Sequence, residues 1–264
     1  ELVTRPRYRG LVSSKESGRM VKNSKRKQRQ AERNWEPPQI ETMTQRQATY
    51  LTMLNEYDCT VASGPAGTGK TYVACAWAGA QLNAKEYHNI VLSRPNVGVG
   101  KTLGMLPGRV EQKMAPWARP LGEAFKQQMG AKRYQEAITS GKIKIEPLEH
   151  IRGLTFDSTV MIIDEAQNTT VAEMKAFLTR IGEDSCVIIA GDESQSDIHH
   201  SQNGLAWVLK AVKRGLVPDV GSIAFAHSDV VRSELCKAWG EAFDTLQREH
   251  NETTKAPATY HGSL

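Results

Sequence analysis

The sequence lacks the features of a membrane, secreted or zinc-binding protein. It has no run of about 18 apolar residues that could cross a bilayer, and its basic N-terminal segment has no apolar stretch of the signal-peptide kind. Its four cysteines form no CxxC pair and have no histidine at metal-ligand spacing. We therefore expect a cytoplasmic protein with no membrane contact and with reduced cysteines, of which Cys186 lies in the core.

The net positive charge comes from one segment of the chain. The formal net charge is +5, yet residues 1–34 hold eleven Lys and Arg side chains against three Glu, so this segment alone carries +8. Such a basic tail favours contact with a polyanion, most simply nucleic acid, through its phosphates. A solvated, disordered leader has the same composition, so both interpretations stay open.

The length and composition fit one domain with appendages. The chain has 264 residues, 39% of them hydrophobic, which is enough for one full core. Pro37 and Pro38 predict a linker. We therefore divide the chain into a basic, flexible tail and linker at 1–40, a folded domain at 41–247 and a polar C-terminal tail at 248–264.

Short apolar runs alternate with helical patterns in the expected domain. This alternation predicts an α/β fold in three layers, with helices on both faces of a mainly parallel sheet. Two runs, 160–163 and 187–190, have no polar alternation and are expected at the centre of the sheet. The six expected strands are 59–62, 90–92, 143–145, 160–163, 187–190 and 223–225.

Two helices are expected from apolar residues at helical spacing. Met174, Phe177, Leu178 and Ile181 predict one helix whose apolar stripe is core. Val231, Leu235 and Trp239 predict a last helix that packs on the sheet.

Residues 64–71 match the pattern G-x-x-x-x-G-K-[ST] of a phosphate-binding loop. An apolar strand precedes the loop, and a helix is expected after it at 72–82, the context this pattern requires. Glycines let successive amides point at phosphate oxygens. We expect Lys70 to reach the β and γ phosphates of ATP and the Thr71 hydroxyl to bind Mg²⁺. The loop comprises Gly64, Pro65, Ala66, Gly67, Thr68, Gly69, Lys70 and Thr71.

Two carboxylates follow the apolar run at 160–163. Asp164 is the Mg²⁺ candidate, since a phosphate-binding loop needs a carboxylate across the sheet for the metal. Glu165 is the candidate general base for the attacking water, which favours hydrolysis. An exposed carboxylate that merely precedes a helix is the alternative for Glu165. The next run ends in Gly191–Gln195, so Gln195 is expected near the γ-phosphate if the strands are neighbours.

With these motifs in place, the chain resembles the PhoH family of P-loop ATPases over residues 43–240. Two motifs are also similar to those of superfamily 1 helicases, which implies a RecA-like core. The stretches that carry the resemblance are Gln47–Tyr50, Gly64–Thr71, Ser93–Pro95, Leu103–Gly108, Arg119–Leu121, Asp164–Thr170, Phe177–Arg180, Gly191–Gln195 and Asp229–Arg232.

The resemblance implies roles for residues that the motifs alone do not assign. It implies that Gln47 contacts adenine and that Gln195 senses the γ-phosphate. Arg232 becomes a candidate arginine finger, although an arginine at the start of a helix is more often a surface or ion-pair residue. Arg94 is a weaker candidate for the same neighbourhood.

The resemblance also bears on partners. Related helicases bind ATP between two RecA-like domains, and this chain has room for one, so we expect a homo-oligomer, with a hexameric ring favoured, in which a neighbour's arginine completes the pocket. Residues 96–130 mix Lys101, Arg109, Lys113 and Arg119 with Trp117 in a stretch broken by prolines. That mixture suits a grip on single-stranded nucleic acid, with a structural insertion as the alternative.

The sequence therefore favours a Mg²⁺-dependent ATPase that RNA or single-stranded DNA stimulates, similar to a helicase or translocase. An ATP-driven regulatory switch or assembly protein stays open. The candidate base at Glu165 argues against a small-molecule kinase, and no NKxD motif for guanine is present.

Overall fold

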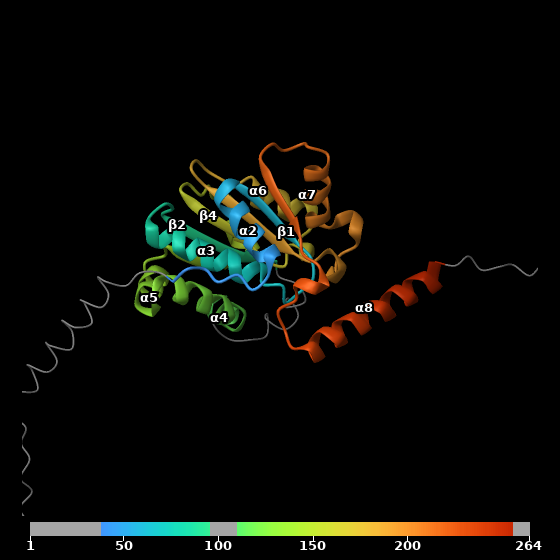
Figure 1. The fold of residues 1–264 in the computed structure, drawn as a ribbon. Helices are drawn as coiled ribbons and strands as arrows, with labels where there is room; N and C mark the ends of the chain where they lie inside the picture. The colour runs from blue at the N-terminus through green and yellow to red at the C-terminus, as the bar shows by residue number, and fades with distance from the viewer. Residues whose placement is uncertain (1–37, 96–109, 256–264) are drawn as a thin grey trace, which may run out of the picture. The chain divides into compact units, whose positions relative to one another are not determined.

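The computed structural model describes residues 38–95 and 110–255, and they build one parallel sheet (Figure 1). Six strands lie in the order β3-β2-β4-β5-β1-β6, and every neighbouring pair is parallel. The α/β class expected from the sequence is thus confirmed, and all six expected strands are present. The strands are β1 (Cys59–Ser63), β2 (Asn89–Arg94), β3 (Ile143–Pro147), β4 (Thr159–Ile163), β5 (Cys186–Gly191) and β6 (Val220–Ala224).

The two strands without polar alternation do occupy the centre of the sheet. All residues of β4 and β5 are buried, because helices cover both faces. Side chains alternate between the faces along β4: Val160 and Ile162 join one core cluster, and Met161 and Ile163 join the other. In contrast, the edge strand β6 exposes every second residue from Ser222 on.

Helices form the two outer layers around this sheet (Figure 1). One core cluster joins the sheet to four helices, and the second joins its other face to two helices and two short 3-10 segments, one of them η3 (Ala166–Asn168). On the first face lie α2 (Gln45–Glu56), α3 (Lys70–Ala84), α4 (Val110–Met129) and α5 (Ala131–Thr139); on the second lie η2 (Leu148–Ile151), α6 (Val171–Leu178) and α7 (Gly204–Lys213).

Helix α4 corrects the expectation that prolines break the stretch around residue 116. The helix continues through both Pro116 and Pro120. Its C-terminal half buries Leu121, Ala124 and Phe125 in the core cluster that includes α3. This burial stabilises the helix despite the backbone hydrogen bonds that two prolines remove.

Helix α6 is shorter than its apolar spacing predicts. Met174 and Phe177 are buried as expected, but the helix ends at Leu178, and Ile181 is 37% exposed. Ile181 instead forms a parallel bridge with Phe156, and the Gly182 amide donates to the Phe156 carbonyl at 2.9 Å. The chain leaves the helix after Leu178 and pairs with the segment at Phe156, so Ile181, the last residue of the apolar stripe, lies outside the helix.

The expectation that the last helix packs on the sheet is wrong. Helix α8 (Glu234–Lys255) begins after Val231, and Leu235 and Trp239 are 71% and 60% exposed. The apolar spacing continues through Phe243 and Leu246, which are also exposed. We call these four residues the α8 apolar face. Amphipathic spacing predicts that a helix has an apolar face, but it does not say what covers that face. The helix also continues into residues 248–255.

Several expectations concern residues beyond this description. The basic tail at 1–34, Lys101, Arg109 and the chain beyond Lys255 lie outside the described residues, as do the side chains of Lys113, Trp117 and Arg119. Among the helices that are described, none has the length and apolar character to cross a membrane. All four cysteines are free thiols, and Cys186 is buried, as expected.

Candidate nucleotide site

The loop at residues 64–71 connects the carboxyl end of β1 to the first turn of α3. Three glycines along it have positive φ angles: 126° at Gly64, 81° at Gly67 and 82° at Gly69. Side chains rarely adopt such angles, whereas glycine does so without steric cost. A Cβ atom at Gly64 would also lie 2.3 Å from the Phe225 carbonyl oxygen. The glycines therefore give the loop the curled path that the motif predicts.

Lys70 lies at the first position of α3, with its ammonium folded back over the loop. Its Nζ donates to the carbonyl oxygens of Gly64 at 2.6 Å and Pro65 at 2.7 Å. Burial lowers the pKa of Lys70, while the nearby carboxylates of Asp192, Asp164 and Glu165 raise it. The ammonium is therefore a desolvated cation, which an anionic phosphate stabilises more strongly than the two carbonyls do.

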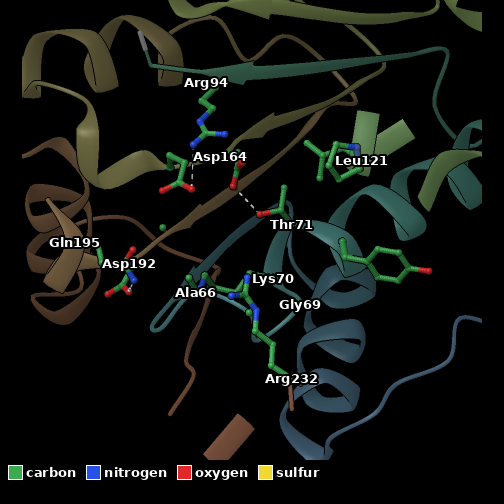
Figure 2. Close-up of a pocket in the computed structure, with 15 residues that line it drawn as sticks. Ala66, Gly69, Lys70, Thr71, Arg94, Leu121, Asp164, Asp192, Gln195 and Arg232 are labelled. Carbon is green, nitrogen blue, oxygen red and sulfur yellow. Dashed lines mark hydrogen bonds and ion pairs between the residues drawn. The ribbon is translucent and has the colours of Figure 1, made fainter. Parts of the chain in front are cut away.

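The two candidate magnesium ligands meet beside the loop. Thr71 Oγ1 donates to Asp164 Oδ1 at 2.6 Å, a contact marked in Figure 2. A hydroxyl and a carboxylate are oxygen ligands of the kind that Mg²⁺ takes in phosphate-binding loops. Within residues 38–95 and 110–255, no three His, Cys, Asp or Glu side chains group as metal ligands. The hydroxyl and carboxylate of the pair fit Mg²⁺, because this ion is usually bound by few protein oxygens together with phosphate and water.

Glu165 follows Asp164 at the end of β4, and two donors hold its carboxylate. Arg94 Nη2, from the end of the neighbouring β2, lies 3.2 Å from Glu165 Oε1. Gln167 Nε2 donates to Glu165 Oε2 at 2.6 Å. The backbone of Glu165 is left-handed, with φ at 52°, a strained conformation for this residue type. Strain of this kind often marks a functional position.

Gln195 lies at the wall of the cavity, after the end of β5. Because β5 lies between β1 and β4, its carboxyl end meets those of the strands that carry the loop and Asp164. Gln195 Nε2 donates to Asp192 Oδ2 at 2.6 Å, and Asp192 Oδ1 accepts from the Ser194 amide at 3.1 Å. These contacts hold the amide of Gln195 at the cavity wall, and its role as a γ-phosphate sensor stays a prediction.

Arg232 approaches the loop from the segment between β6 and α8 of the same chain. The Val231 amide donates to the Gly67 carbonyl at 2.9 Å. A Cβ atom at Gly67 would lie 2.7 Å from Arg232 Nε, so the guanidinium group passes directly over this glycine. Figure 2 shows Arg232 and Arg94 on opposite sides of Lys70.

These side chains line one cavity of about 360 Å³. The structure thus brings together most of the residues singled out from the sequence, including Arg94, the weaker arginine candidate. The others are Ala66, Gly67, Gly69, Lys70, Thr71, Asp164, Glu165, Gln195 and Arg232.

Gln47, the candidate for adenine recognition, lies behind the loop rather than in this cavity. Its side chain is buried, with Nε2 donating to the Thr68 carbonyl at 2.9 Å and Oε1 accepting from the Met43 amide at 2.7 Å. Both ends of the amide are therefore engaged within the chain. Each end of the amide keeps one further hydrogen-bonding position, and the adenine contact stays a prediction.

Two residues gain importance only from the structure. Gln167 is buried and links two strands: its Nε2 contacts Glu165, and its Oε1 accepts from the Asp192 amide at 2.9 Å. Asp192 in turn positions Gln195. The sequence placed both residues inside motifs without giving them a role. Gln167 follows β4 and Asp192 follows β5, so only the strand order reveals that the two residues meet.

The parallel sheet, the glycine-rich loop and the paired carboxylates define a P-loop NTPase. The model of the PhoH-like protein family matches residues 39–244 of this chain, which is most of its length. The chain belongs to the PhoH-like protein family.

Curated relatives agree with this assignment. A PhoH-like protein of Bacillus subtilis is 41% identical over 206 residues, covering 78% of this chain and 63% of the relative. A PhoH-like protein of Synechocystis is 37% identical over 83% of this chain and 65% of its own length. Protein PhoH of Escherichia coli is 38% identical over 72% of this chain and 54% of its own length. The chain thus spans less than two thirds of these relatives.

Solved structures with a similar fold are more distant. The large terminase of a thermophilic bacteriophage is 12% identical with a TM-score of 0.48, covering 74% of this chain and 48% of that one. The Pif1 helicase of Candida albicans is 15% identical with a TM-score of 0.36, and the match covers 70% of this chain and 40% of the helicase. At these values neither likeness says what this chain binds.

Proposed function

We propose that this chain is a Mg²⁺-dependent ATPase. The observation that carries the proposal is the convergence of Lys70, Asp164 and Glu165 on one cavity, from the P-loop and from the end of β4. Lys70 would hold the β and γ phosphates. Asp164 and Thr71 would hold the metal, which neutralises charge on the phosphates.

Glu165 would act as the general base in this reaction. The water oxygen forms a new bond to the γ-phosphorus, the bond from that phosphorus to the bridging oxygen breaks, and ADP leaves with the electron pair. The water proton goes to the Glu165 carboxylate. Gln195, held by Asp192 at 2.6 Å, would sense the γ-phosphate, and Arg232, above Gly67, would offset charge in the transition state.

RNA or single-stranded DNA is the proposed activator, as for a helicase or translocase. Support comes from the +8 charge of residues 1–34 and from the mixture of cations and Trp117 in residues 96–130. Both segments suit contacts to a phosphate backbone that do not depend on sequence. The helicase and terminase activities in the names of the two solved structures describe those proteins and not this chain, so they do not support the proposal.

The test of this proposal is ATP hydrolysis with single-stranded RNA and single-stranded DNA at two salt concentrations. We expect stimulation, with the half-stimulating strand concentration rising at least about tenfold between about 50 and 200 mM salt if three or more phosphates are contacted. A duplex of the same length serves as the control. Hydrolysis that no strand stimulates would instead favour the ATP-driven switch or assembly protein.

A homo-oligomer, with a hexameric ring favoured, is the proposed assembly. The exposed α8 apolar face supports it, because contiguous exposed apolar residues often mark an interface. Arg94 and Arg232 of the chain itself line the cavity. The site therefore has arginines of its own, which weakens the case for an arginine supplied by a neighbouring subunit. We expect the activity per chain to fall when dilution dissociates the oligomer, as measured alongside mass by light scattering. A monomer with full activity would contradict this assembly.

A further inference from the structure

The carboxylate of Glu165 has one donor on each of its two oxygens. Arg94 Nη2 lies 3.2 Å from Oε1, and Gln167 Nε2 lies 2.6 Å from Oε2. A general base must turn a carboxylate oxygen to the water whose proton it accepts. Each carboxylate oxygen keeps a further lone pair, but the two contacts fix the direction in which the carboxylate faces. Turning Glu165 toward an attacking water therefore requires one of the two donors to move.

The two donors differ in how firmly the chain holds them. Gln167 is 1% exposed, and its Oε1 also accepts from the Asp192 amide at 2.9 Å, so moving it would break a buried hydrogen bond. The side chains of Arg94 and Glu165 are 35% and 36% exposed. An ion pair exposed to this degree contributes little stability. Of the two contacts to Glu165, the one from Arg94 is therefore the more easily exchanged.

A destination for Arg94 lies in the same cavity. Its guanidinium lines the cavity together with Lys70, Thr71 and Asp164. A terminal phosphate held by Lys70 would therefore lie in the cavity that the Arg94 guanidinium also lines. Its planar donors match phosphate oxygens better than they match a single carboxylate oxygen.

We propose that Arg94 is the positioning residue that reports a terminal phosphate to Glu165. A bound nucleoside triphosphate draws the guanidinium from Glu165 onto its terminal phosphate, and Glu165 is then able to turn toward the attacking water. A nucleoside diphosphate has no such phosphate, so the pair persists. This role rests on the proposed ATP site. It adds that Arg94 distinguishes a bound nucleoside triphosphate from a diphosphate.

The test compares binding of ADP and of the β,γ-imido analogue of ATP, both with Mg²⁺, by calorimetry. For Arg94→Ala we expect about tenfold weaker binding of the analogue, the loss of one charge-assisted contact, with ADP affinity within about twofold of wild type. Arg94→Lys should restore part of the difference. Arg133→Ala, an arginine that bonds Asn83 away from the cavity, is the matched control and should change neither affinity.

Retained ADP binding shows that the variant is folded, so the result does not depend on stability. Equal losses for both nucleotides, or no loss for either, would overturn the proposal while leaving the ATP site intact. A wild-type protein that binds neither nucleotide would overturn the proposed function, and this inference with it.

Discussion

Glu165→Gln is expected to lower ATP turnover by about 10²- to 10⁴-fold, the usual contribution of a general base, while ATP still binds. The amide keeps the size of the side chain but cannot accept the water proton. In the proposed site Lys70, Thr71 and Asp164 would hold the phosphates and the metal without it, so binding should persist. Phosphate release under single-turnover conditions and nucleotide binding by calorimetry measure the two effects separately.

A matched control for this variant is Glu136→Gln, which changes an exposed glutamate on α5. It removes the same charge at a position that does not line the cavity, so turnover should match wild type. Normal turnover in Glu165→Gln would remove Glu165 as the base, and Asp192, a carboxylate that also lines the cavity, would become the candidate.

Lys70→Ala is expected to remove nucleotide binding at ordinary concentrations. Lys70 supplies a buried ammonium at the centre of the loop, and one charge-assisted hydrogen bond contributes about 1.5–3 kcal/mol. Because the ammonium would contact two phosphates, we expect ATP affinity to fall by about 100-fold or more. Lys175→Ala on the exposed side of α6 is the control and should bind ATP normally. ATP affinity near wild type in Lys70→Ala would contradict the phosphate-binding assignment of the loop.

The strands and the loop could be predicted because their signals are local. Residues 160–163 and 187–190 are continuously apolar, and such runs in an alternating α/β pattern indicate central parallel strands. The loop at 64–71 carries its own conformational requirement in its glycines. The central position of the two strands and the curled path of the loop are both confirmed. Each could be predicted because its signal lies within the segment itself.

Contacts between distant segments were beyond the sequence. Arg94 meets Glu165 because β2 lies beside β4, and the order of strands in the chain does not state that neighbour relation. Arg232 reaches Gly67 because the segment after β6 bonds to the loop through Val231. The apolar spacing of α8 correctly predicts a helix, but the prediction that this helix packs on the sheet is wrong. These features depend on tertiary packing, which periodicity does not encode.

The most direct test of the central claim is phosphate release from ATP by the purified protein, with Mg²⁺ and with the metal removed by a chelator. The account predicts steady hydrolysis with Mg²⁺, restored hydrolysis when Mg²⁺ is added back after chelation, and almost none in the Glu165→Gln variant assayed in parallel. Hydrolysis that proceeds equally without a divalent metal, or no hydrolysis at all with Mg²⁺ and single-stranded nucleic acid present, would contradict it.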